Sequence, residues 1–217
     1  ANDNTAVGFC SLNKNTTGAS NTAVGFKSAL TNTTGACNVS VGERSLLVNT
    51  TGASNTAVGF RAMEDNTTAS NNTAVGSQAL FANTTGFGTA VGYKAMTANT
   101  TSAGGTAMGF QALCSNTTGD NNTAFGLEAL SKNTTGTRNT AVGRDALEAN
   151  TTGADNVAVG YNSLCVNTTG TKNVAVGTGA LERNTTASNN VAVGFDAMLK
   201  TTTGCRNVGV GESALKE

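Results

Sequence analysis

The chain has 217 residues, with 27 Gly and no Pro, Trp or His; 12% of the residues are charged and the formal net charge is zero. This balance argues against nucleic acid and against an anionic membrane surface as partners, because both require clustered Lys and Arg. No apolar run approaches the roughly 18 residues that cross a bilayer, so we expect no membrane insertion.

A single repeat fills the chain. The glycine of an A-V-G element recurs from Gly8 to Gly211 every 17 residues, except for one step of 16 between Gly76 and Gly92. A fixed period of this kind is typical of repeat architectures. We number the unit 1 to 17 from the Asn before T-A-V-G, so that Asn21 is position 1. We expect a single repeat domain over residues 1–217 without distinct caps.

Each unit opens with a predicted strand at positions 2 to 4, which are residues 22–24 in the second unit. Position 2 is Thr or Val, position 3 is small, position 4 is mostly Val, and position 5 is always Gly. β-Branched residues closed by Gly favour a short strand and its turn. The invariant Gly implies a positive φ or an approach too close for a Cβ.

The rest of the unit contains a second apolar position and a second β-prone stretch. Position 8 is small and position 9 is Leu or Met in twelve units; the second unit is read as slipping by one place at Ala29 and Leu30. Positions 12 to 14 are N-T-T in eleven units, followed mostly by Gly. Adjacent threonines should point to opposite faces of the extended chain, so that only one of the two in each coil faces outward. We expect positions 2, 4 and 9, with one threonine, to form the core.

Charge placement gives an independent test of burial. All 26 charged residues fall at positions 6, 7, 10, 11, 16 or 17, which are therefore predicted to face solvent. A helix would not tolerate Gly and T-T in every turn. The pattern predicts an all-β protein, a parallel β-solenoid (β-roll or β-helix) of thirteen 17-residue coils, in which like residues stack about 4.8 Å apart.

The N-[TV]-A-V-G element, followed by a small residue and Leu, resembles the head repeats of YadA-like trimeric autotransporter adhesins. The longer form N-T-A-V-G-F-x-A-L-x-x-N-T-T-G is also similar to repeats of phage tail-fibre-type proteins. The resemblance covers the whole chain, which differs in its longer period and its added N-T-T-G. It implies a left-handed coil, trimerisation through the apolar strand, and an adhesive or shaft role.

Aromatic residues at position 6 are candidates for contact between chains. They share their column with charged residues elsewhere, as at Glu43 and Arg144, which is typical of a partly covered rim. Either they fold over their own coil or they are buried against another copy of the chain, where aromatic enrichment is expected. The seven residues are Phe9, Phe26, Phe60, Tyr93, Phe110, Tyr161 and Phe195.

The N-T-T element is an N-glycosylation acceptor pattern, one per coil. The alternative is an asparagine ladder that caps a turn, because Asn also recurs at position 1, where no acceptor pattern forms. The residues at stake are Asn15, Asn32, Asn49, Asn66, Asn83, Asn99, Asn116, Asn133, Asn150, Asn167 and Asn184.

The five cysteines are scattered over the unit. Cys114 and Cys165 share a column but lie three coils apart, roughly 14 Å by the strand spacing and beyond the ~7 Å limit for a disulfide. We expect either free thiols or bridges between chains, which an odd count permits.

No motif predicts chemistry. Without His, the chain lacks the commonest general acid–base and the commonest nitrogen ligand for metals, and its carboxylates form no recurrent pair, so we expect neither an enzyme nor a cofactor or metal site.

The expected function is an extracellular structural or adhesive fibre on a cell or virion surface. Its partners would be further copies of itself, as a homotrimer or a head-to-tail homopolymer, and a receptor or glycan on a host surface. The alternative is an ice-binding β-solenoid with ladders of Thr and Asn; against it, position 2 changes from Thr to Val at residues such as Val157 and Val174.

Overall fold

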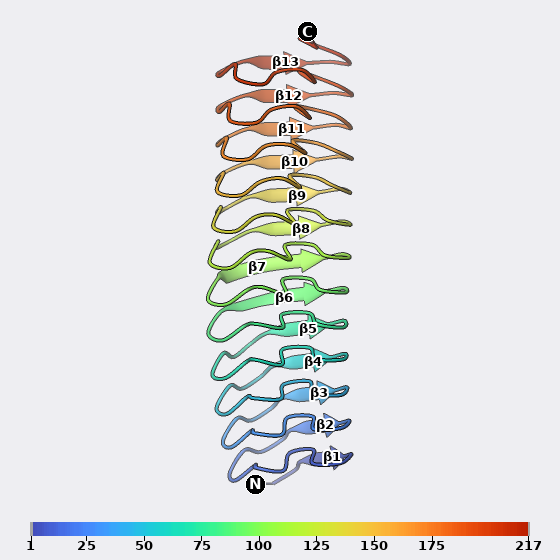
Figure 1. The fold of residues 1–217 in the computed structure, drawn as a ribbon, viewed down its shortest axis with the longest axis vertical. Helices are drawn as coiled ribbons and strands as arrows, with labels where there is room; N and C mark the ends of the chain where they lie inside the picture. Colours follow the sequence, from blue (N-terminus) through green and yellow to red (C-terminus); the bar gives the residue numbers. More distant parts are fainter. Residues whose placement is uncertain (1, 217) are drawn as a thin grey trace. The chain divides into compact units, whose positions relative to one another are not determined.

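The computed structural model describes residues 2–216, and their internal contacts divide the chain into two compact units, Ala1–Gly105 and Thr106–Glu217. Within the described residues there are strands and turns but no helix, and a strand recurs about every 17 residues. Figure 1 shows the strands of each unit following one another in chain order. The fold class predicted from the repeat, a parallel β-solenoid, is confirmed, whereas the single domain stays a prediction.

The strands are short. Those of the first unit are β1 (Thr5–Val7), β2 (Thr22–Val24), β3 (Val39–Val41), β4 (Thr56–Val58), β5 (Thr73–Val75) and β6 (Phe87–Val91). The others are β7 (Ala103–Met108), β8 (Thr123–Phe125), β9 (Thr140–Val142), β10 (Val157–Val159), β11 (Val174–Val176), β12 (Val191–Val193) and β13 (Val208–Val210).

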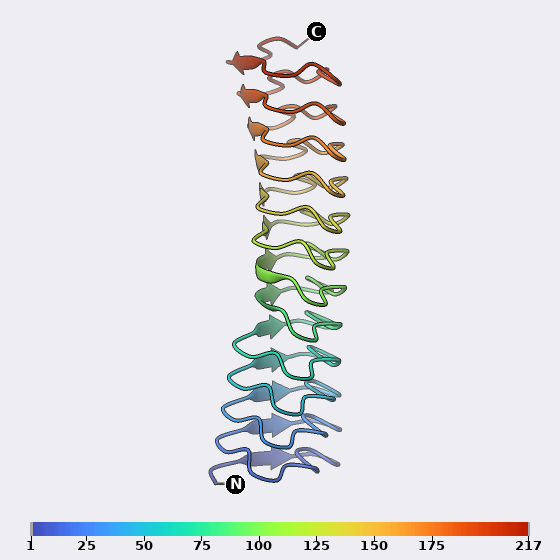
Figure 2. The ribbon, with the colours of Figure 1, turned by 90° about the vertical axis from the view of Figure 1, so that its left-hand side faces the viewer.

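Neighbouring strands within each unit pair in parallel and in register, position on position. In the first unit Thr5 pairs with Thr22, and in the second Thr140 pairs with Val157. Figure 2 shows the strands of each unit along one side of its coils and the turns on the other. Like side chains therefore form files along each unit, spaced by the strand separation of about 4.8 Å.

The strand side chains that point into the core are not the ones predicted from the sequence. The position-3 residue, which is Ala in most strands, is buried in β2 to β13, with Ala158 and Ala141 fully inaccessible, while the flanking Val142 is 38% exposed. Positions 2 and 4 thus point outward, and their assignment to the core was wrong. Between positions 3 and 8 the interior has room only for small side chains, because these positions lie opposite each other: the hydroxyls of Ser40 and Ser45 are 2.6 Å apart.

Position 9 is the large buried column, as predicted. Leu113, Leu130 and Leu147 are inaccessible. In the second unit, where Ala29 and Leu30 sit one place late in the pattern, Ala29 is buried in this column, and its N–H donates to Ser45 O of the next coil at 2.9 Å, as position 9 does elsewhere. Backbone stacking keeps the register there, and Leu30 takes the outer position 10.

The invariant Gly at position 5 has a positive φ angle and also lies too close to the next coil for a Cβ, which are the two reasons predicted from the sequence. At Gly143 the φ angle is 133°, a region that favours Gly, and an added Cβ would lie 2.5 Å from Gly160 O of the next coil. The chain therefore has no room for a side chain there in successive coils.

Three more positions per coil, 7, 9 and 17, have left-handed backbones although most are not Gly. Asp145 has φ 56°, Leu147 52° and Asp155 60°. This conformation costs roughly 1–2 kcal/mol for an L-residue. Hydrogen bonds between coils hold it; the N–H of Leu147, for example, donates to Ser163 O at 3.0 Å.

Candidate functional site

Among residues 2–216 no cavity is found, and no group of His, Cys, Asp or Glu is arranged to hold a metal. The same stretch contains no helix long and apolar enough to span a bilayer. The candidate sites are therefore surfaces. Each consists of the side chains at one or two repeat positions, stacked from coil to coil into a row that we call a file.

The asparagines of the N-T-T element form a buried ladder. The Nδ2 of Asn133 donates to Asn116 Oδ1 at 2.8 Å and to Gly136 O at 3.0 Å, and Asn133 Oδ1 accepts from Asn150 at 2.7 Å. All of these residues are at most 1% exposed except the half-buried Asn15. A glycan on these amide nitrogens would break the hydrogen bonds of the ladder. In the folded coil, N-glycosylation and the asparagine ladder therefore exclude each other.

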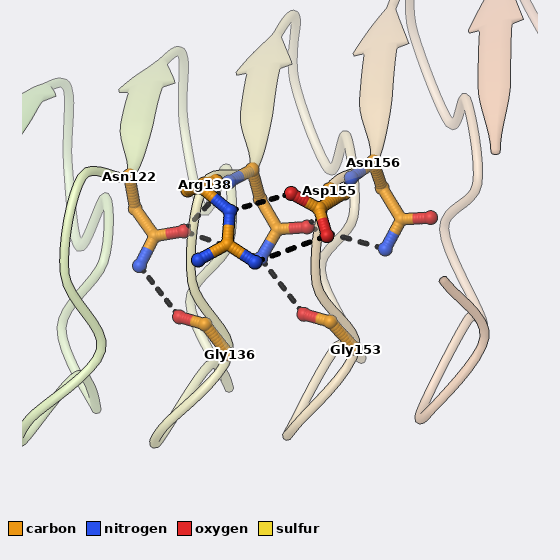
Figure 3. Close-up of polar contacts among 7 residues, drawn as sticks. Asn122, Gly136, Arg138, Gly153, Asp155 and Asn156 are labelled. Carbon is orange, nitrogen blue, oxygen red and sulfur yellow. Dashed lines mark hydrogen bonds and ion pairs between the residues drawn. The ribbon is translucent and has the colours of Figure 1, made fainter. Parts of the chain in front are cut away.

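The asparagines of position 1 form a second ladder with a different pattern (Figure 3). Asn122 Oδ1 accepts from the backbone N–H of Asn139 at 2.9 Å, and Asn122 Nδ2 donates to Gly136 O at 2.7 Å. Both ladders satisfy turn carbonyls and amides that would otherwise be buried without partners, which stabilises the coil.

The two threonines of each N-T-T element have different surroundings. At position 13 the hydroxyl bonds the backbone of the next coil, as Thr134 Oγ1 does to Thr151 O at 3.1 Å. At position 14 the side chain is exposed in all twelve coils that have it. The single outward file of threonines predicted from the sequence is thus confirmed.

The outer strand face, defined as positions 2 and 4 of each coil, is free of charge. Besides Val142, its exposed residues in the second unit include Phe125 at 38% and Val193 at 37%. Sequence reasoning missed this face, because a period of two does not say which set of side chains points inward. The invariant small residue at position 3 was the signal that could have shown it.

The position-6 aromatics border this face, two residues beyond position 4. They do not fold fully over their own coil: Tyr93 is 42% exposed and Phe9 68%. Phe9 and Phe26 stack with centroids 5.7 Å apart, and Lys27 Nζ lies 5.0 Å from the Phe26 centroid. The full set lies between these two exposed fractions: Phe9, Phe26, Phe60, Tyr93, Phe110, Tyr161 and Phe195.

The charged residues lie at half-buried or exposed positions, as predicted, with one exception among those described. Glu64 is only 3% exposed and pairs with Arg44 at 2.5 Å and with Arg61. Burial raises the pKa of the neighbouring Asp65, and the negative charge of Glu64 adds to this effect. The Arg61 guanidinium also lies 4.8 Å from the Phe81 ring centroid. Glu64, Arg44 and Arg61 therefore form an ion-pair cluster within the fold.

The five cysteines are free thiols in this structure. Cys37 and Cys205 are exposed, whereas Cys165 is half-buried with its Sγ 3.7 Å from Glu148 Oε2. Burial raises the pKa of Cys165 to about 12, and the Glu148 carboxylate contributes to the shift. Bridges between chains stay a prediction.

Comparison of the chain with models of protein families, with curated proteins and with solved structures gives no match.

Proposed function

We propose that the chain is a non-enzymatic structural or adhesive fibre protein that works outside the cell, on a cell or virion surface, as an assembly of several copies. The observation that carries this proposal is the outer strand face. It combines exposed β-branched side chains, a flanking aromatic file and no charge, which is the composition of the centre of a protein–protein interface.

A second copy of the same chain fits this face best. Its files repeat at the strand spacing, so an identical sheet presents side chains at matching intervals, as in the dry interfaces between stacked sheets. Charges at the neighbouring positions 6 and 7, such as Arg144 and Asp145, would then lie at the rim. A trimer around a threefold axis uses this contact, and so does a polymer of copies packed side by side, whereas a head-to-tail filament would join the coil ends instead. Aromatics that the contact leaves exposed would serve adhesion to a receptor or glycan.

The proposal is tested by placing a charged residue on the outer strand face and measuring the mass of the assembly. The native mass in solution, measured by light scattering, is expected to correspond to three chains, or to an open-ended polymer, for the unaltered protein. Val176→Lys should reduce it to one chain, because a buried unpaired charge is costly. Ala149→Lys is the matched control, since position 11 already carries Lys132 in another coil. A single-chain mass for the unaltered protein, or equal masses for both variants, would contradict the proposal.

One observation favours ice binding as a second candidate. Thr and Val face outward together from positions 2 and 4, so each unit presents two parallel files about 6.6 Å apart, repeated about every 4.8 Å. Such a regular, uncharged lattice could order water. Thermal hysteresis of the freezing point, abolished by Thr140→Lys on this face and retained by Ala149→Lys, is the outcome expected of an ice-binding protein; absence of hysteresis removes this candidate.

A further inference from the structure

The threonine file at position 14 is the one exposed file that does not vary. Position 14 is Thr in all twelve coils that contain it, whereas positions 6, 7, 10, 11, 16 and 17, which are exposed or half-buried in most coils, each carry several residue types, charged ones included. The residues are Thr17, Thr34, Thr51, Thr68, Thr85, Thr101, Thr118, Thr135, Thr152, Thr169, Thr186 and Thr203.

Folding does not account for this constancy. The position-14 hydroxyls make no hydrogen bond within the described chain, in contrast to those of position 13, such as Thr151, which donates to Thr168 O at 3.1 Å. Position 14 lies in a bend and not in a strand, so β-propensity gives no reason for Thr. A surface residue that packs on nothing usually tolerates substitution.

The hydroxyls are also accessible. The next residue, position 15, is Gly, Ala or Ser, and is buried in most coils, so no long side chain covers the hydroxyl from there. The asparagine two residues earlier is locked in its buried ladder. On this edge of the coil, the hydroxyl oxygen of the position-14 Thr is therefore accessible for modification, whereas the amide nitrogen of the N-T-T Asn is not.

We propose that the position-14 threonines are O-glycosylation sites, and that one edge of each unit carries a file of sugars linked to oxygen. In the transfer, Oγ1 of Thr forms a bond to the anomeric carbon of a nucleoside-diphosphate sugar. The bond from that carbon to the diphosphate breaks, the nucleoside diphosphate leaves with the bonding electrons, and the hydroxyl proton passes to the base of the transferase. This inference does not depend on the proposed fibre assembly.

The experiment is peptide mapping of the chain purified from its natural producer, by mass spectrometry with electron-transfer fragmentation. The expected result is a set of hexose or N-acetylhexosamine increments on position-14 threonines, none on position 13 or on the ladder asparagines, and release of the sugar by alkaline β-elimination. An intact mass equal to the bare polypeptide, or increments on asparagine, would overturn the proposal.

Variants made in the same producer sharpen the result. Thr135→Val, Thr152→Val and Thr169→Val together should remove three increments without lowering the melting temperature, because these hydroxyls bond nothing in the fold. Ser at the same three positions should keep the increments. The matched set Thr134→Val, Thr151→Val and Thr168→Val should keep the sugars but lower the melting temperature, since it removes hydroxyl bonds between coils. Loss of increments in this matched set and not in the first would contradict the assignment.

Discussion

At the scale of single residues, the coil depends on polar side chains with a defined partner on each side. Asn133 donates to one neighbouring coil and accepts from the other, and it is inaccessible to water. A buried amide left without its partner costs more than the hydrogen bond is worth, since it has also lost its water. The ladders therefore favour Asn at positions 1 and 12, where Gly88, Gly105 and Thr201 are the exceptions.

Replacing one ladder asparagine should destabilise the fold. Asn133→Ala removes the hydrogen bond to Asn116 Oδ1 and leaves one donor of Asn150 without its ladder partner, so the free energy of unfolding is expected to fall by about 1–3 kcal/mol. Asn13→Ala, at an exposed position, should change it by less than about 0.5 kcal/mol. Urea titrations followed by circular dichroism measure both, and equal losses would argue against the ladder.

Cys165 makes stability depend on pH in the alkaline range. Its pKa rises from 9.0 to about 12 on folding, mainly through burial. The folded state therefore favours the protonated thiol, and this contribution is complete below pH 9 and is lost as pH rises toward 12. Cys165→Ala should show a shallower loss of stability over this range, and alkylation at pH 8 should label Cys37 and Cys205 well before Cys165. Equal labelling rates for the three thiols would contradict this.

At the scale of the element, most strands are three-residue segments that bury their central, smallest side chain and leave the larger ones half-buried or exposed. The interior needs this because positions 3 and 8 face each other closely, as the pair Ser40 and Ser45 shows. The large apolar side chains are divided between an inner column at position 9 and an outer face at position 4. The inner column stabilises the coil, and the outer face is left exposed to solvent in the single chain.

The reversed alternation predicts losses of different size for two neighbouring substitutions. Ala158→Val adds volume to the filled interior and should lower the free energy of unfolding by about 1–3 kcal/mol. Val159→Ala removes volume from the outward side and should cost less than about 1 kcal/mol in a single chain. Denaturation at low protein concentration checks both; a larger loss for Val159→Ala would mean that position 4 is the core.

At the scale of the molecule, each coil contacts the coils before and after it within its unit. Backbone bonds such as Gly143 N to Phe125 O, at 2.8 Å, repeat from coil to coil. Stability in such stacks is close to a sum over repeats and their interfaces. A change in coil number is therefore tolerated where the residue columns stay aligned.

Deletion of one whole coil should leave a folded protein. Removing residues 139–155 joins Arg138 to Asn156, so position 17 is again followed by position 1, and the melting temperature should fall by only about a few degrees. Removing residues 139–147 joins Arg138 to Glu148 instead and sets every later column out of register within that coil. This second variant should lose cooperative unfolding, as measured by calorimetry; similar behaviour of both would contradict a fold held by stacked columns.

The sequence by itself determined the period, the solenoid class, the Leu column at position 9, the Gly at position 5 and the outward charges, because each depends on residue type repeated at one position. It did not decide which way the strand faces, since Thr-Ala-Val alternates equally well in both directions. Only the tertiary structure decided that, through the close approach of positions 3 and 8, and it likewise placed Ala29 in the Leu column and Glu64 beneath two arginines. Left-handed φ angles at Leu147 and its equivalents have no sequence signal, because hydrogen bonds between coils impose them on a residue that would not choose them.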